Sequence, residues 1–129
     1  MAWNLDSDRP IYAQLVAILK MQIVSGLYHP GDRLPSVRDL AQEANVNPNT
    51  MQKAFSELER SGLIITMRTS GRIVTEDINM IKGTQLELAK ESIKVFLENM
   101  KQLGYTEKEI LTLLKEITDS ETVKEDTDQ

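Results

Sequence analysis

Apolar side chains recur at helical spacing in three segments near the start of the chain. In residues 10–25, 36–45 and 48–61 they lie three or four positions apart, which places them on one face of a helix. The pattern therefore predicts three amphipathic helices around a common core. The predicted inner positions are Ile11, Leu15, Val16, Ile18, Leu19, Gln22 and Ile23 in the first helix, Val37, Leu40, Ala41 and Ala44 in the second, and Met51, Ala54, Phe55 and Leu58 in the third.

Capping residues mark where these helices begin and end. Ser36 followed by Asp39 is a capping-box pattern, in which the hydroxyl accepts a hydrogen bond from a backbone N–H of the first turn. Asn47 followed by Pro48 is an N-cap with proline at the first helical position, where the missing N–H costs nothing. Gly62 suits the left-handed residue that ends a helix. The second and third helices are therefore predicted to be joined by a short turn.

Two short runs after the third helix have the composition of β-strands. Residues 63–67 and 72–75 are rich in Ile, Val and Thr, and the loop Arg68-Thr69-Ser70-Gly71 separates them. Three helices followed by a hairpin, with a short turn before the third helix, are the parts of a winged helix-turn-helix. We therefore expect residues 1–75 to form a winged helix-turn-helix DNA-binding domain. The predicted fold class is mainly α with a small β-hairpin.

The second half of the chain follows a different pattern. Residues 76–83 lack a clear periodicity and are predicted to form a linker. In residues 84–118, apolar side chains three and four apart predict a two-helix hairpin. Residues 119–129 have almost no apolar side chains, so we expect a disordered acidic tail there.

The predicted C-terminal hairpin carries a long apolar stripe. The stripe is more extensive than one short hairpin buries internally, so we predict that it forms a homodimer interface. The alternative is that this face packs only on the winged helix of its own chain. The predicted interface residues are Leu86, Ala89, Ile93, Phe96, Leu97, Met100, Leu103, Leu113 and Ile117.

The charge of the chain is unevenly distributed. The formal net charge is -5, which by itself favours an ordinary acidic protein over a nucleic-acid binder. Residues 1–75, however, hold 8 Lys and Arg against 7 Asp and Glu, whereas residues 76–129 hold 7 Lys against 13 Asp and Glu. Because phosphate contacts depend on local basic surface, the acidity of the second half leaves DNA binding by the first half open.

The composition argues against an enzyme, a metal site and a membrane protein. The chain has no cysteine and a single histidine, His29, so we expect no metal site. It also lacks a phosphate-binding glycine pattern and a nucleophile with an identifiable base, so we expect no catalytic residues and no cofactor. No apolar run reaches the ~20 residues of a membrane span, and the N-terminus lacks signal-peptide features. We therefore expect a cytoplasmic protein without a membrane partner.

The sequence does not identify a small-molecule effector. The C-terminal hairpin has too little material to enclose a ligand pocket of the usual ~300 Å³ or more, unless two subunits build the pocket together. We therefore predict no dedicated ligand-binding domain.

The third helix carries polar side chains of the kind that contact DNA bases. Asn49 and Thr50 lie in its first turn, and Gln52 and Lys53 follow one step further. Asn and Gln can form paired hydrogen bonds with adenine, and the helix N-terminus favours phosphate oxygens. The alternative is that Asn47 and Asn49 only cap the helix and that Lys53 is a solvated surface lysine.

The hairpin loop has basic residues on either side. Arg68 and Arg72 flank Thr69-Ser70-Gly71, where glycine lets the backbone approach a phosphate or enter the minor groove. A basic hairpin tip is more often only soluble surface, but its position directly after a predicted recognition helix favours a DNA contact.

Two long runs resemble a known family. The run PGDRLPSVRDLA at residues 30–41 is similar to the signature of the GntR family of bacterial regulators, and VNPNTMQKAFSELERSGLI at residues 46–64 continues it. The resemblance covers roughly residues 9–75. The Asn-Pro-Asn-Thr turn and a C-terminal part of only two helices resemble the small YtrA-like subgroup. This resemblance implies a dimeric repressor, often of a transporter operon.

The resemblance also implies roles for individual residues. Ser36 and Arg38 would hold phosphates, Asn49 and Thr50 would approach the major groove, and Thr69-Ser70-Gly71 would enter the minor groove. Many relatives carry arginines within the third helix where this chain has Pro48 and Gln52, so their operator sequence cannot be transferred. The predicted DNA-binding residues are Arg33, Ser36, Arg38, Asn47, Asn49, Thr50, Gln52, Lys53, Arg68, Thr69, Ser70, Gly71 and Arg72.

These observations predict a transcriptional regulator that binds double-stranded DNA as a homodimer. The alternative is a winged-helix module that binds another protein and never contacts DNA, since one fold serves both uses.

Overall fold

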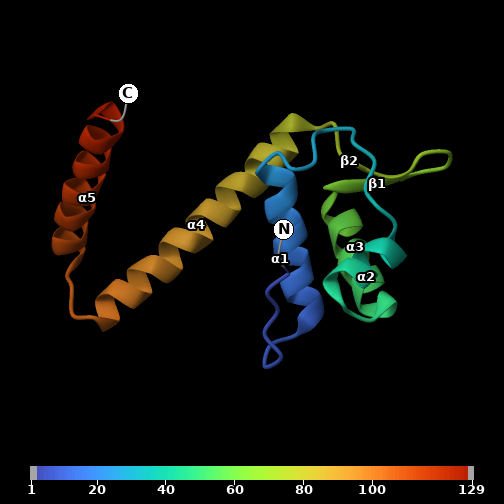
Figure 1. The fold of residues 1–129 in the computed structure, drawn as a ribbon, viewed down its shortest axis with the longest axis horizontal. Coiled ribbons are helices and arrows are strands. Elements are labelled where there is room, and N and C mark those ends of the chain that lie inside the picture. The colour runs from blue at the N-terminus through green and yellow to red at the C-terminus, as the bar shows by residue number, and fades with distance from the viewer. Residues whose placement is uncertain (1–2, 128–129) are drawn as a thin grey trace. The chain divides into compact units, whose positions relative to one another are not determined.

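The computed structural model describes residues 3–127, and the side chains of residues 3–121. Three helices come first in the chain, α1 (Ile11–Val24), α2 (Val37–Ala44) and α3 (Pro48–Ser61). The strands β1 (Ile64–Met67) and β2 (Gly71–Val74) follow and form a hairpin (Figure 1). This order confirms the predicted winged helix-turn-helix, and the predicted fold class is correct.

The winged-helix core lies where α1 and α2 pack against α3. Leu15, Leu40 and Phe55 each supply a fully buried side chain from a different helix. The predicted caps are present: the N–H of Asp39 donates to Ser36 Oγ at 3.0 Å, and the N–H of Asn49 donates to Asn47 Oδ1 at 2.8 Å. These caps set the start of α2 and of α3, and therefore the direction of α3 from the core.

The C-terminus of α3 ends against a neighbouring side chain. Gly62 has the left-handed φ of +86°, and a Cβ at this position would lie 2.9 Å from Sδ and Cε of Met80. Any larger residue would therefore have a strained backbone, and the flexible end of the Met80 side chain would have to shift.

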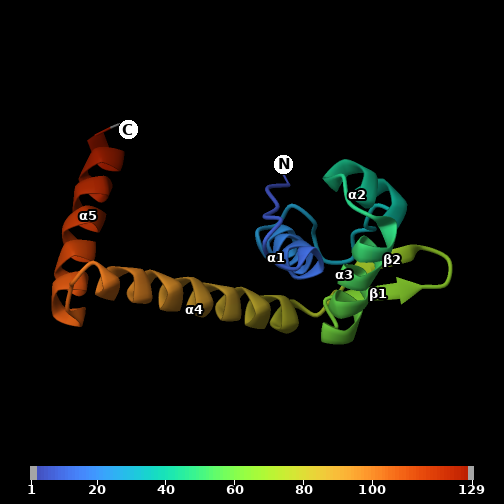
Figure 2. The same cartoon turned by 90° about the horizontal axis from the view of Figure 1, so that it is seen from below.

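The segment before α2 pairs with the wing through an isolated bridge that the sequence pattern did not reveal. β1 and β2 pair antiparallel, and Arg33 forms a bridge with Ile73 on the other side of β2. The N–H of Leu34 donates to the carbonyl of Arg72 at 2.8 Å, and the N–H of Gly31 donates to that of Val74 at 2.9 Å. The loop between β1 and β2 projects away from α3 in both views (Figures 1 and 2).

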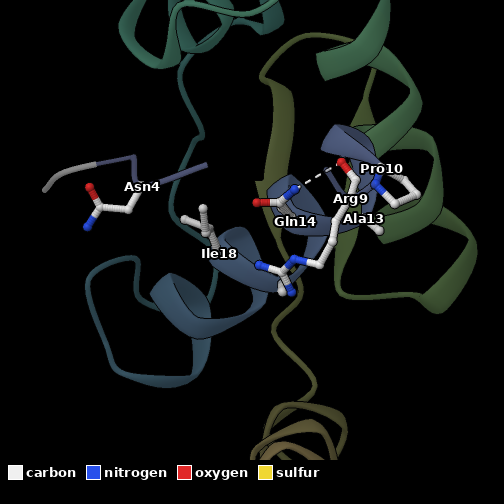
Figure 3. Close-up of a pocket in the computed structure, with 7 residues that line it drawn as sticks. Asn4, Arg9, Pro10, Ala13, Gln14 and Ile18 are labelled. Atoms are coloured by element: carbon white, nitrogen blue, oxygen red, sulfur yellow. Dashed lines mark hydrogen bonds between the residues drawn. The ribbon is translucent and has the colours of Figure 1, made fainter. Parts of the chain in front are cut away.

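Three predicted inner positions of α1, Ile11, Val16 and Ile18, are only partly buried, although Ile11 and Val16 still pack against the core. Gln14, which was not among the predicted inner positions, is buried. Burial of its amide is possible because the amide exchanges two hydrogen bonds of 2.7 Å with the backbone of Asp6. The amide also donates a third hydrogen bond, of 3.2 Å, to the carbonyl of Arg9 (Figure 3). Gln14 thus attaches the N-terminal segment to α1.

Two further helices follow the wing, α4 (Ile78–Gln102) and α5 (Glu107–Thr127). The chain divides between Leu88 and Ala89 into two compact units, so α4 begins in the first unit and continues into the second. In the described part of the chain, no helix combines the length and apolar character that crossing a membrane requires.

The predicted linker of residues 76–83 is wrong in its extent, because α4 already begins at Ile78. Asp77 accounts for this start, since its Oδ1 accepts a hydrogen bond of 3.2 Å from the N–H of Met80. Ile81 is partly buried against the winged-helix core. A cap and one core contact therefore support helix in a segment whose periodicity is weak.

The predicted disordered tail also differs from the structure. α5 continues to Thr127, past the predicted start of the tail at residue 119, while residues 128–129 lie outside the described residues. Glu and Lys have high helix propensity, so a helix can extend without an apolar face. A capping box stands at the start of α5, where Thr106 and Glu109 exchange hydrogen bonds of 3.0 and 3.2 Å.

Candidate nucleic-acid interface

The exposed face of α3 carries a row of polar side chains. Asn49, Gln52, Lys53 and Ser56 are all exposed and lie three or four positions apart, so they share one side of the helix. Thr50 is partly buried beside them. The sequence interpretation did not include Ser56, although its spacing of four from Gln52 could have indicated it. The major groove of DNA is wide enough to admit an α-helix that presents such a face to the bases.

Two predicted phosphate or base contacts already serve as helix caps. Asn47 Oδ1 accepts the N–H of Asn49, and Ser36 Oγ accepts the N–H of Asp39. The Ser36 hydroxyl keeps its own proton and is exposed, so it can still donate to a phosphate oxygen. Capping and DNA contact are therefore compatible at Ser36.

Lys53 is oriented by an aromatic ring from α1. Its Nζ lies 3.8 Å from the centroid of the Tyr12 ring, a cation–π contact that restricts the lysine without neutralising it. Sequence reasoning missed Tyr12, because no local pattern links α1 to the exposed face of α3. Arg38 is exposed on α2.

The tip of the wing is exposed and contains one glycine in a left-handed conformation. Arg68, Thr69 and Ser70 are exposed, and Gly71 has a φ of +74°. A Cβ at Gly71 would lie 3.7 Å from Nε of Arg33, so the structure brings Arg33 to the wing. Two exposed cationic side chains, those of Arg33 and Arg68, are therefore associated with the hairpin.

Arg72 lies in a different environment from the other wing residues. Its side chain is only 28% exposed, and its Nε donates to Glu59 Oε1 of α3 at 2.7 Å. Its guanidinium carbon lies 5.4 Å from the centroid of the Phe55 ring, and Nη2 lies 3.5 Å from Gln52 Oε1. Of the predicted DNA-binding residues, Arg72 is thus the one tied by an ion pair to α3.

A separate apolar surface lies in the second compact unit. None of the residues of α4 is buried, and Ile93, Leu103 and Ile117 are 56%, 73% and 52% exposed. α4 and α5 border a groove of about 520 Å³, to which Leu111 and Leu114 add apolar side chains that the predicted interface did not include. Of the predicted set, Leu86 and Ala89 are also exposed, whereas Phe96, Leu97, Met100 and Leu113 are partly buried.

Comparison with known proteins identifies the family of the chain. Residues 11–74 match the model of "Bacterial regulatory proteins, gntR family". The chain is 37% identical to the uncharacterized HTH-type transcriptional regulator YhcF of Bacillus subtilis, over 90% of this chain and 96% of that protein. It is 36% identical to the HTH-type transcriptional repressor YtrA of the same organism, over 87% of each chain.

A solved structure extends the similarity to the whole fold. A GntR family transcriptional regulator from Listeria monocytogenes is 38% identical, with a TM-score of 0.79, over 87% of this chain and 98% of that one. These relatives are transcriptional regulators and not enzymes, in agreement with the sequence interpretation. The chain belongs to the GntR family of bacterial transcriptional regulators, which bind DNA through a winged helix.

Proposed function

We propose that this protein is a repressor that binds a palindromic operator as a homodimer. The observation that carries the proposal is the exposed polar face of α3, which starts at a capped helix N-terminus. The same winged helix also carries the exposed arginines of the wing. In this arrangement α3 enters the major groove, and the wing loop contacts the neighbouring backbone and minor groove.

The homodimer is supported by the size of the surfaces involved. A single small winged helix covers too little DNA for tight operator binding, whereas a two-fold dimer presents two copies of α3 to two half-sites. The exposed apolar side chains of α4 and α5 provide a surface that a second copy can cover.

Repression is supported by the name of one relative, the repressor YtrA. A dimer that occupies an operator excludes other proteins from the same DNA. The resemblance to YtrA-like regulators extends the proposal to a transporter operon as the target.

Asn49 and Thr50 are expected to contribute to sequence selection. We expect Asn49→Ala and Thr50→Ala each to weaken specific binding by about 1–3 kcal/mol, the usual value of one good contact between a side chain and a base edge. Binding to competitor DNA should stay the same. Mobility shifts with the DNA upstream of the protein's own gene, and with duplexes enriched from a random pool, measure both affinities.

Asn79→Ala is the matched control, because Asn79 is an exposed asparagine at the start of α4. If specific and competitor binding fall together, Asn49 and Thr50 only position the protein on DNA and do not select its sequence. A wild-type protein that enriches no sequence would instead favour a protein-interaction module.

Arg38 and Lys53 are expected to hold phosphates. Replacing either with Ala should weaken all DNA sequences alike and lower the slope of log K against log salt by ~0.9, the contribution of one phosphate contact. Titrations at several salt concentrations measure the slope, with Lys115→Ala on α5 as an exposed lysine control. Slopes equal to that of the wild type in both variants would contradict the assignment.

A further inference from the structure

The side chain of Arg72 connects the wing to the exposed face of α3. Its ion pair with Glu59 is short, at 2.7 Å, and the two side chains are 28% and 34% exposed. The Phe55 ring lies beneath the guanidinium at 5.4 Å. Arg72 is therefore held from two sides, and its remaining N–H groups have a defined direction.

One of these N–H groups is directed at Gln52. Arg72 Nη2 lies 3.5 Å from Gln52 Oε1, and Gln52 Nε2 lies 3.4 Å from Ser56 Oγ. An arginine side chain has only donors, so the amide oxygen and not the NH₂ group must face it. The two contacts are long, but both favour the same orientation of the amide.

The orientation of this amide decides which base it can recognise. Paired hydrogen bonds with adenine require the amide oxygen and the NH₂ group to face the same base edge. In this structure one of the two lone pairs of the oxygen faces Arg72 on the protein surface, and the NH₂ group has a second hydrogen that Ser56 does not use. The side chain thus offers a donor to the groove.

We propose that Arg72 is a positioning residue that sets Gln52 to recognise a base edge with hydrogen-bond acceptors, guanine rather than adenine. Guanine offers N7 and O6 as acceptors in the major groove, and it has no donor there. This inference rests on the proposed function, because it assumes that α3 lies in the major groove.

The same contacts distinguish Arg72 from a phosphate-binding residue. Its charge is balanced by Glu59, whereas Arg68 is exposed at the wing tip. Loss of Arg72 should therefore leave the salt slope of binding unchanged, and loss of Arg68 should lower it by ~0.9.

The experiment enriches duplexes from a random pool with the full-length protein and with its variants. Gln52→Ala identifies the operator position that Gln52 contacts, as the position where base preference disappears. At that position the wild type should prefer guanine over adenine by roughly tenfold, within the usual range for one base contact. Arg72→Met should remove or reverse this preference and leave the other positions unchanged.

Arg68→Met is the matched control, since it removes a wing arginine that has no part in the Gln52 contacts. It should weaken binding and keep every base preference. Arg72→Lys keeps the charge but not the planar fork, so it should lose the guanine preference as Arg72→Met does. If circular dichroism shows that the Arg72→Met variant does not fold, the Arg72→Lys variant provides the test in its place.

Several results would overturn the inference. It is wrong if the wild type prefers adenine at the Gln52 position, or if both Arg72 variants keep the guanine preference. It is also wrong if Arg72→Met lowers the salt slope as Arg68→Met does. A wild-type protein that enriches no sequence would instead contradict the proposed function itself.

Discussion

Replacing Ile93 and Phe96 together with glutamate is expected to convert the dimer into a monomer that no longer binds its operator. Both side chains border the apolar groove of the second unit. In the proposed dimer a second copy covers this surface, so the variant would bury two unpaired carboxylates at a cost of several kcal/mol. Each separated chain would then carry a single copy of α3 and lose the second half-site.

Sedimentation and mobility shifts measure the two effects. Lys94→Glu is a matched control, because it changes the net charge by the same amount on the same helix at an exposed position outside the stripe. We expect this control to remain dimeric. The winged helix of the double variant should keep its circular dichroism. A wild-type protein that sediments as a monomer at tens of micromolar concentration would refute the dimer without any variant.

Phe55→Ala is expected to cost about 3–5 kcal/mol of the free energy of unfolding of the winged helix. Phe55 is fully buried within the packed helices, and its removal leaves a cavity that the neighbouring side chains fill only partly. Because small domains are stable by only about 5–15 kcal/mol, this change removes a large share of the total. Specific DNA binding should fall with the folded fraction.

Phe96→Ala is the same chemical change at a partly buried position of the second unit. Trp3 is the single tryptophan and packs against the winged-helix core, so its fluorescence during urea unfolding reports on the first unit. At protein concentrations below the dissociation constant of the dimer, the chains are monomeric. Under that condition Phe96→Ala should leave this transition close to that of the wild type. Similar midpoints for the two variants would contradict the assignment of Phe55 to the core of the winged helix.

The positions of the DNA-contact candidates suggest a division of labour within the winged helix. Asn49 and Lys53 lie on the exposed face of α3, whereas Arg72 lies between the wing and that helix. Truncation of an exposed cation is therefore expected to change affinity for all DNA, and truncation of Arg72 to change base preference. This contrast makes salt slope and base preference the two informative measurements for every variant.

Much of the winged helix could be predicted from the sequence because its signals are local. The helix periodicities, the caps at Ser36 and Asn47, and the glycine that ends α3 depend on residues within a few positions of one another. The same local order placed Asn49 and Gln52 at the start of an exposed helix face. The family resemblance rests on residues 30–64, which contain these local signals.

Other features were decided only by the tertiary structure, because they join residues that are distant in the sequence. Burial of Gln14 depends on the backbone of Asp6, and the start of α4 is supported by packing of Ile81 on the core. Lys53 is oriented by Tyr12, and Arg72 by Glu59. Periodicity shows which side of a helix is exposed, but the partners of a polar side chain depend on which elements pack beside it.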